Sequence, residues 1–149
     1  MRMAEMKAKC VLVVDDDAEL LEAYRDTLDA AGYRVTTARC VREALEAMAA
    51  SFEQEGAGAF DLVVSDVIME EKDSGFYLCY RLKRDPATSG TPVLLLSSTR
   101  RDEGVRFSLR DSGTREWLSA DDIMNKPVTP DELLLRVGRL LTTRRDMSA

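Results

Sequence analysis

Three adjacent carboxylates, Asp15, Asp16 and Asp17, directly follow the apolar run Val11–Val14. Neighbouring carboxylates repel one another, and each is costly to remove from water at the end of a buried segment. Two interpretations explain such a cluster: a solvated loop, or a site in which a cation offsets the repulsion. The second interpretation requires other polar groups at the same place in the fold.

Each of three further apolar segments ends with a side chain that could take part in such a site. Asp66 ends "DLVVSD", Ser97 lies near the end of "TPVLLLSS", and Lys126 follows "DDIMN" and precedes a proline. If these groups meet, carboxylates outnumber the ammonium, and a hard divalent cation with oxygen ligands would balance them. We therefore expect a Mg²⁺ site, and we expect Asp17 to cap the helix that follows it.

The elements that would position these groups alternate along the chain. Short apolar or β-branched segments indicate strands, and apolar residues at helical spacing indicate helices. Strands are expected around residues 11–14, 34–37, 61–65, 91–98 and 123–124, and helices around residues 20–31, 41–52, 75–83 and 130–141. This alternation predicts an α/β fold with a parallel sheet covered on both faces. Ligands of such sheets bind beyond the carboxyl ends of the strands, where the polar groups are expected.

Composition excludes several classes of function. The chain of 149 residues contains no histidine, so by itself it cannot form a serine or cysteine hydrolase triad, a histidine-ligated zinc site or a phosphohistidine. Its net charge of −6 argues against direct binding to nucleic acid. Its three cysteines are scattered, and its basic N-terminus lacks a long apolar run. We therefore expect a cytoplasmic domain with neither a disulfide framework nor a membrane span.

Four motifs in register, "VVDDD", "DLVVSDVIM", "TPVLLLSS" and "DDIMNKP", resemble those of the receiver domains of two-component response regulators. The resemblance covers residues 10–141 and leaves tails at residues 1–9 and 142–149. It implies a flavodoxin-like, doubly wound sheet of five parallel strands in the order 2-1-3-4-5, with helices on both faces. Whether the chain is a single-domain regulator or part of a longer one stays open.

The resemblance also implies roles for individual residues. Asp66 takes the place of the phosphorylated aspartate. Ser97 takes the place of the hydroxyl that binds the phosphoryl group after transfer, and Lys126 that of the lysine that pairs with it. Metal and lysine would neutralise two anionic reactants, so that the transfer needs mainly correct positioning. The implied Mg²⁺ ligands are Asp15, Asp16, Asp66 and the backbone carbonyl of Ile68.

The same resemblance implies signalling partners rather than a conventional enzymatic activity. A sensor histidine kinase, a phosphotransfer protein or a small phosphodonor would phosphorylate Asp66. Phosphorylation would switch a surface that binds an unidentified downstream protein, and a homodimer that forms on phosphorylation is a further implication. Neither nucleic acid nor a membrane is expected as a direct partner.

Two other functions remain open on the sequence. One is a pseudo-receiver, a protein-interaction module that is never phosphorylated, and the intact set of acidic, hydroxyl and lysine residues argues against it. The other is a phosphohydrolase that uses Asp66 as a transient nucleophile. That chemistry requires a second aspartate two residues later as acid or base, and Ile68 occupies this position.

Several positions depart from the usual receiver pattern. Ile123 stands where many receivers have the aromatic residue that moves with the switch hydroxyl. Thr99–Ala120 is longer than the usual connection and lacks a clear amphipathic stripe, so we expect a short, displaced or irregular helix and an unusual output surface. Asp121 and Asp122 are expected to form a turn, and Tyr24 is expected to pack in the core.

Overall fold

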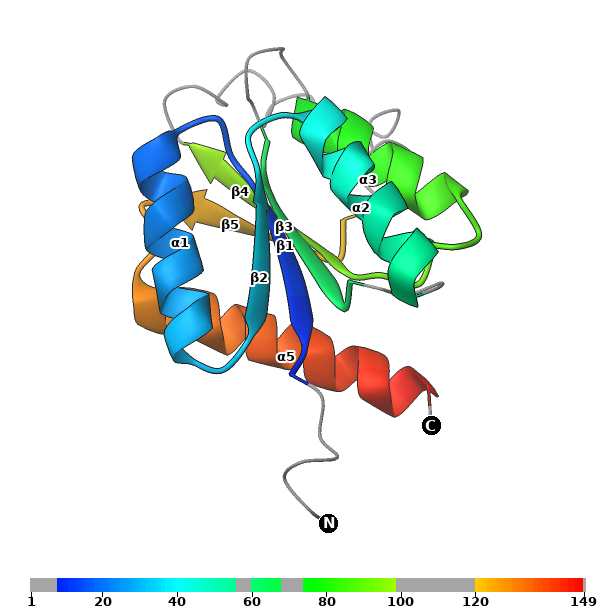
Figure 1. The fold of residues 1–149 in the computed structure, drawn as a ribbon. Coiled ribbons are helices and arrows are strands. Elements are labelled where there is room, and N and C mark those ends of the chain that lie inside the picture. Colours follow the sequence, from blue (N-terminus) through cyan, green and yellow to red (C-terminus); the bar gives the residue numbers. More distant parts are fainter. Residues whose placement is uncertain (1–7, 56–59, 68–73, 99–119, 149) are drawn as a thin grey trace, which may run out of the picture.

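The computed structural model describes residues 8–55, 60–67, 74–98 and 120–148. The strands are β1 (Cys10–Val14), β2 (Arg34–Ala38), β3 (Leu62–Asp66), β4 (Val93–Ser98) and β5 (Asp122–Lys126). The helices are α1 (Ala18–Ala30), α2 (Val41–Glu55), α3 (Ser74–Arg84) and α5 (Pro130–Ser148). Strands and helices alternate from β1 to β4, as the sequence predicts, and β5 and α5 follow the segment that is not described (Figure 1). Within the described ranges, no helix combines the length and the apolar character that a membrane span requires.

All neighbouring strands run parallel, in the order β2-β1-β3-β4-β5. This order confirms the doubly wound sheet expected from the sequence. The register places Asp66 beside Leu96 and Lys126 beside Ser98, so the carboxyl ends of β3, β4 and β5 reach the same edge of the sheet. β1 ends at this edge as well, because Val14 pairs with β3 one residue before Asp66.

An apolar layer covers each face of the sheet. Leu12 and Val63 belong to the layer packed against α2 and α3, whereas Val13 and Val64 belong to the layer packed against α1 and α5. Consecutive residues of a strand point to opposite faces, so neighbours in the sequence enter different layers. The two pairs of helices lie on opposite sides of the sheet (Figure 1). Burial on both faces explains why β1, β3 and β4 are nearly continuous apolar runs.

The ends of α1 are set by residues that the sequence alone identifies. Asp17 is the N-cap, and its side chain accepts hydrogen bonds from the backbone N–H groups of Glu19 (3.0 Å) and Leu20 (3.2 Å). The predicted capping role is therefore confirmed. After the other end, Gly32 adopts a φ of 97°, a left-handed conformation that glycine tolerates best, and the chain turns toward β2. The two aspartates before the cap are thereby held between β1 and the first turn of α1.

The start of β5 differs from the sequence prediction of a turn. Asp122 begins the strand, and its carboxylate accepts a hydrogen bond from Arg136 of α5 at 2.7 Å. Asp121, just before the strand, accepts hydrogen bonds from Lys83 Nζ (2.9 Å) and from the backbone N–H of Val93 (2.7 Å). The conformation of Asp121 and Asp122 is therefore decided by partners from distant parts of the chain. Local turn preferences do not reveal such partners. The contacts join α3, β4, β5 and α5 at the amino edge of the sheet, opposite the polar edge.

Two further sequence predictions concern the limits of the domain and its longest connection. α5 continues to Ser148, beyond residue 141 where the resemblance to receivers ends. The segment 99–119, which makes up nearly all of the predicted irregular region, lies outside the described residues. The domain limits and the form of this segment therefore stay predictions.

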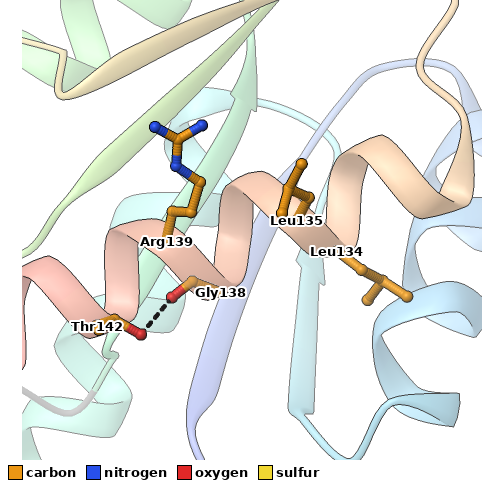
Figure 2. A pocket seen from close by; sticks show the side chains of 5 residues that line it. All are labelled: Leu134, Leu135, Gly138, Arg139 and Thr142. Atoms are coloured by element: carbon orange, nitrogen blue, oxygen red, sulfur yellow. Dashed lines mark hydrogen bonds between the residues drawn. The ribbon is translucent and has the colours of Figure 1, made fainter.

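Two glycines in helices have opposite surroundings. Gly75, in the first turn of α3, lies against the backbone of Asp66 and Val67, and a Cβ at this position would overlap the carbonyl oxygen of Asp66. The Gly75 N–H donates to the carbonyl oxygen of Val67 at 2.8 Å, which holds α3 against the end of β3. Gly138 of α5 borders a shallow hollow, and a Cβ there would meet no atom within 4 Å (Figure 2). The residues that line the hollow are Leu134, Leu135, Gly138, Arg139 and Thr142.

Alanine substitutions at these two glycines should have opposite effects on stability. Gly138→Ala should raise the free energy of unfolding by about 0.5–1 kcal/mol, because alanine favours a helix and its methyl group meets open space. Gly75→Ala should lower it by about 1–3 kcal/mol, because α3 must move away from the end of β3. Urea unfolding of the two variants measures both changes. A destabilising Gly138→Ala or a neutral Gly75→Ala would contradict this description of the packing.

Candidate functional site

An acidic cluster lies at the carboxyl edge of the sheet. One carboxylate oxygen from each of Asp15, Asp16 and Asp66 lies within 4.8 Å of the other two. Asp15 and Asp66 are buried, and Asp16 is half-buried. The first two aspartates follow β1 and the third ends β3, and these strands are neighbours in the sheet. The parallel pairing of the two strands therefore brings together carboxylates that are far apart in the sequence.

Asp15 is held in a fixed orientation. Its backbone N–H donates to the carbonyl oxygen of Ala38 at 3.1 Å, which ties the residue after β1 to the end of β2. Its Oδ1 atom accepts a hydrogen bond from the backbone N–H of Asp17 at 2.9 Å. Its Oδ2 atom accepts a hydrogen bond from Lys126 Nζ at 3.1 Å. Both carboxylate oxygens are thus oriented by the protein itself, as a precise ligand site requires.

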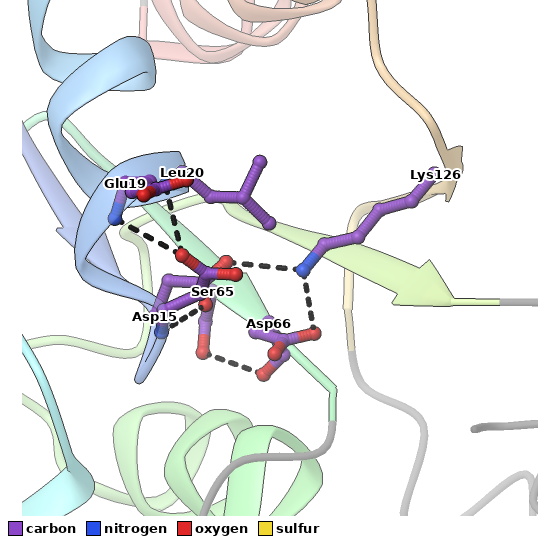
Figure 3. Close-up of polar contacts among 7 residues, drawn as sticks. Asp15, Glu19, Leu20, Ser65, Asp66 and Lys126 are labelled. Carbon is purple, nitrogen blue, oxygen red and sulfur yellow. Dashed lines mark hydrogen bonds and ion pairs between the residues drawn. The ribbon is translucent and has the colours of Figure 1, made fainter.

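Lys126 lies between the two buried carboxylates (Figure 3). Its ammonium nitrogen is 3.1 Å from Asp15 Oδ2 and 3.3 Å from Asp66 Oδ1, and only 13% of its side chain is exposed. The lysine is the last residue of β5, and a cis peptide bond joins it to Pro127. Because β4 lies between β5 and β3, the long side chain crosses the width of one strand to reach Asp66.

The cluster carries an excess of negative charge. Burial lowers the pKa of Lys126, but the neighbouring Asp15 and Asp66 carboxylates raise it by more, so the pKa lies above its ordinary value and the lysine stays protonated. Among the described residues, the three carboxylates of the cluster then have one ammonium beside them, which pairs with Asp15 and Asp66. The excess suits a divalent cation, and carboxylate oxygens are the ligands that Mg²⁺ prefers. The residues present therefore fit the metal site predicted from the sequence.

Ser97 has a buried hydroxyl close to the level of the cluster. Leu96 of β4 pairs with Asp66, and Ser97 is the next residue along this strand. Among the described residues, the Ser97 Oγ atom has no hydrogen-bond partner. Leaving a buried hydroxyl unpaired costs about 1–3 kcal/mol, so such a group in a folded protein requires an explanation. A ligand that brings an acceptor oxygen to this edge of the sheet would supply one.

Tyr24 is a neighbour of the cluster that the sequence does not identify. As predicted, the side chain packs in the core, on the α1 side of the sheet. Burial raises the pKa of its phenol, and Lys126, Asp15 and Asp66 add smaller shifts of both signs, which places the ring within electrostatic range of all three. The sequence holds only a weak signal for this position, a residue with a polar tip on the otherwise apolar stripe of α1.

The structure brings together most, but not all, of the residues predicted to form the site. Four of them form one cluster: Asp15, Asp16, Asp66 and Lys126. Ser97 lies on the adjacent strand, one residue beyond Asp66 in register. Ile68, whose carbonyl is predicted to bind the metal, lies outside the described residues. The positions of the described residues agree with the predicted site, whereas their roles in phosphorylation and metal binding stay predictions.

The sheet order and the acidic edge together define a class of protein. A family model described as "Response regulator receiver domain" matches residues 11–138. The chain therefore belongs to the response regulator receiver domain family, as its motifs indicate. This family consists of phosphoacceptor signalling modules rather than conventional enzymes.

Comparison with individual proteins agrees with this classification. The chain is 28% identical over 131 residues to the response regulator SaeR of Staphylococcus epidermidis, a match that covers 88% of this chain and 49% of SaeR. Its structure is similar to that of the chemotaxis response regulator CheY4 of Vibrio cholerae, with a TM-score of 0.70, 29% identity and coverage of 90% of this chain and 99% of CheY4. It is also similar to the receiver domain of a signal transduction histidine kinase from Syntrophus aciditrophicus, with a TM-score of 0.73, 32% identity and coverage of 91% and 92%. The chain spans about half the length of the curated relatives that it matches.

Removal of the shared lysine should destabilise the Mg²⁺-free protein. Lys126→Met leaves Asp15 and Asp66 without their counter-charge and should lower the free energy of unfolding near neutral pH by about 2–3 kcal/mol, somewhat less than for a fully buried pair. Arg42→Met is the control for loss of an exposed ion pair, because Arg42 and its partner Glu46 have side chains that are 72% and 64% exposed. The control should lose about 1 kcal/mol or less in the same urea unfolding experiment with EDTA.

The difference between wild type and Lys126→Met should also depend on pH. The folded-state pKa of Lys126 lies above the ordinary value of 10.5, so the lysine contributes its full stabilisation below pH 10.5 and loses it as the pH rises through the folded-state pKa. As the pH rises from neutral, the stabilities of the two proteins should therefore approach each other only in the alkaline range. Convergence near neutral pH, or a Lys126→Met variant as stable as wild type, would contradict the ion pairs described.

Proposed function

We propose that this chain is a phosphoacceptor of a two-component phosphorelay and is phosphorylated on Asp66 in a Mg²⁺-dependent reaction. The observation that carries the proposal is the cluster of Asp15, Asp16 and Asp66, with Lys126 shared between the two buried carboxylates. Membership of the receiver family supports the same conclusion. Asp66 is the preferred acceptor because it ends β3, the central strand of the sheet, where neighbours on both sides can contribute to the site.

The proposed reaction is a direct phosphoryl transfer to a carboxylate. An oxygen of Asp66 forms a bond to the phosphorus atom of the phosphodonor. The bond from phosphorus to the leaving group, which is a histidine nitrogen or an oxygen of a small acyl phosphate, breaks, and the leaving group keeps the electron pair. Both reactants are anionic and repel one another. Lys126 lies 3.3 Å from Asp66 and can pair with an oxygen of the transferred group after only a small movement.

The acidic residues would hold the metal that assists this transfer. We propose Asp15, Asp16, Asp66 and the backbone carbonyl of Ile68 as the protein ligands. Mg²⁺ bound by them would supply positive charge to the phosphoryl oxygens. Asp15 is already oriented for this role, because both of its carboxylate oxygens accept hydrogen bonds from the protein.

Ser97 would couple phosphorylation to a change in conformation. A phosphoryl oxygen on Asp66 would give the buried Ser97 hydroxyl an acceptor that it lacks among the described residues. The new hydrogen bond would fix the end of β4, which leads directly into the segment Thr99–Ala120. We propose that this segment forms part of the surface that a downstream protein recognises and that phosphorylation shifts its population of conformers.

The proposed partners follow from the chemistry and the charge of the chain. These 149 residues contain no histidine, so a phosphohistidine donor has to lie outside them, and we propose that it belongs to a sensor histidine kinase or a phosphotransfer protein. The downstream partner is proposed to be a protein, which includes a second copy of this chain, because a net charge of −6 opposes direct binding to nucleic acid. The three cysteines are odd in number and scattered along the chain, which supports the cytoplasm as the proposed compartment.

Intact mass after incubation with acetyl phosphate tests the proposed function. With Mg²⁺, the wild-type chain should gain the mass of one phosphoryl group, and Asp66→Asn should gain none. Asp16→Asn should lose most of the gain, because the nucleophile remains but a metal ligand is missing. Asp122→Asn is the matched control, since this aspartate lies at the amino edge of the sheet, and it should be phosphorylated like wild type.

Two results would contradict this proposal. Phosphorylation that survives Asp66→Asn would place the acceptor elsewhere, and phosphorylation that is unaffected by EDTA would exclude the metal requirement. A wild-type chain that gains no mass from acetyl phosphate or from a phosphorylated kinase would instead favour the pseudo-receiver, an interaction module without phosphorylation.

Serine substitutions on neighbouring strands should separate signalling from stability. Ser97→Ala removes a hydroxyl without a described partner, so the stability of the unmodified chain should be unchanged or higher. Ser65→Ala is the matched control, because the Ser65 hydroxyl is buried and donates to the carbonyl oxygen of Asp66 at 3.0 Å, and its loss should cost about 1 kcal/mol. Amide chemical shifts with beryllofluoride, a mimic of the phosphoryl group, should show the conformational response in Ser65→Ala and a much smaller one in Ser97→Ala. A full response in Ser97→Ala would exclude the proposed role of its hydroxyl.

A further inference from the structure

Two tyrosine–arginine pairs lie side by side on the outer face of α3. Arg81 Nη1 donates to the Tyr77 hydroxyl at 3.0 Å, and Arg84 Nη1 donates to the Tyr80 hydroxyl at 2.7 Å. The guanidinium carbon atoms lie 5.8 Å and 5.1 Å from the centres of the respective tyrosine rings. Tyr77 and both arginines are exposed, and Tyr80 is half-buried. We call these four residues the tyrosine–arginine surface of α3.

Most of the binding capacity of the two guanidiniums is unused. Within the described part of the chain, neither Arg81 nor Arg84 forms an ion pair with a carboxylate. An arginine has five N–H donors in a planar fork, and in each of these two only Nη1 forms a hydrogen bond within that part of the chain. The tyrosines therefore hold each guanidinium in place while its other nitrogens remain available to a partner.

Helix stability accounts for only part of this arrangement. Basic residues in the last turn of a helix interact favourably with its C-terminus, and Arg81, Lys83 and Arg84 all belong to that turn of α3. Lys83 shows the structural use of such a residue, because its ammonium binds the Thr91 carbonyl oxygen and the Asp121 carboxylate, both at 2.9 Å. The two arginines instead lie on the exposed side, each beside a tyrosine one turn earlier. Tyrosine and arginine are the residues enriched where protein interfaces gain most of their affinity.

We propose that the tyrosine–arginine surface of α3 binds an acidic peptide segment of a partner protein. Residues three or four positions apart on a helix have Cβ atoms about 5–6 Å apart, so the two guanidiniums can engage two carboxylates of one segment. An extended segment offers this spacing at positions i and i+2, and a helical segment offers it at i and i+3 or i+4. Each guanidinium binds a carboxylate through two parallel hydrogen bonds. The exposed ring of Tyr77 provides contact area for an apolar residue of the same segment.

Charge decides which kind of partner this surface fits. The surface is positive on a chain whose net charge is −6. A short acidic segment is attracted by the two arginines at close range, whereas a nucleic acid, with its high and extended charge density, is repelled by the rest of the molecule. The arginines are already ordered by the tyrosines, which lowers the entropic cost of binding. The surface shares no residue with the acidic cluster, so its binding can be tested on the unphosphorylated chain.

An NMR titration of the full ¹⁵N-labelled chain tests the proposal. The probe is the peptide Gly-Glu-Leu-Glu-Leu-Glu-Gly, and the control probe has glutamine in place of each glutamate. The acidic peptide should shift the amide signals of α3 and the side-chain signals of Arg81 and Arg84 to saturation, and the glutamine peptide should not. The double variant Arg81→Gln, Arg84→Gln should bind the acidic peptide about tenfold more weakly. The double variant Arg25→Gln, Arg139→Gln has the same net charge and exposed substitutions on α1 and α5, and it should bind like wild type.

A second pair of substitutions tests the role of the tyrosines. The double variant Tyr77→Phe, Tyr80→Phe keeps the rings and removes the hydroxyls that hold the arginines, so we expect a smaller loss of affinity than for the arginine variant. Because the substituted groups lie on the exposed side of the helix, thermal unfolding should show that all of these variants remain folded. Three results would overturn the proposal: shifts located away from α3, equal affinity of the two arginine double variants, or binding of oligothymidine at α3 in place of the acidic peptide.

Discussion

Repulsion among carboxylates at the ends of buried strands is the constraint on which the rest of this structure depends. A doubly wound parallel sheet brings the carboxyl ends of its strands to one edge, and here aspartates directly follow β1 and end its neighbour β3. The apolar layers on both faces leave this edge as the place where water and ligands reach the strand ends. Lys126 from the edge strand β5 offsets part of the repulsion. Among the described residues, what remains is an excess of negative charge in an oriented and partly buried site, and such a site suits a divalent cation.

Most of the fold could be predicted from the sequence because burial on both faces produces continuous apolar strands that are hard to mistake. The cap of α1 could be predicted as well, because Asp17 acts on backbone groups two and three residues away. Prediction failed at Asp122, whose conformation depends on Arg136 of α5, fourteen residues later in the chain. Gly75 gave no sequence signal either, because its close approach to Asp66 depends on how α3 packs against β3. Sequence rules predict a conformation correctly where the interacting groups are close in the sequence, as at Asp17. They fail where tertiary contacts determine the conformation, as at Asp122 and Gly75.

In the acidic site, too, the sequence predicts which residues take part, whereas their burial and hydrogen bonds depend on tertiary contacts. The residue types at the strand ends were sufficient to select Asp15, Asp16, Asp66 and Lys126, because the carboxyl ends of parallel strands meet at one edge of the sheet. The depth of Lys126 and the missing partner of Ser97 could not be predicted. Both follow from the register of β3, β4 and β5, whose strands come from distant parts of the chain. The interpretation of Tyr24 was incomplete for a similar reason, since only the packed structure shows that its ring lies within range of the lysine.

The hydrogen bonds of Asp121 and Asp122 at the amino edge have a consequence for the way the sheet can deform. They fix the beginnings of β4 and β5 to α3 and α5, so these strands cannot slide along one another without breaking charged contacts. β5 has five residues, so Lys126 lies four steps, or about 13 Å, from this fixed end at Asp122. A tilt of about 5° about the fixed end would displace the backbone of the lysine by about 1.1 Å, which is on the scale of the shifts that accompany switching in proteins. The anchored beginning therefore leaves tilt, rather than sliding, as the movement by which β5 can respond to a change of charge at the carboxyl edge.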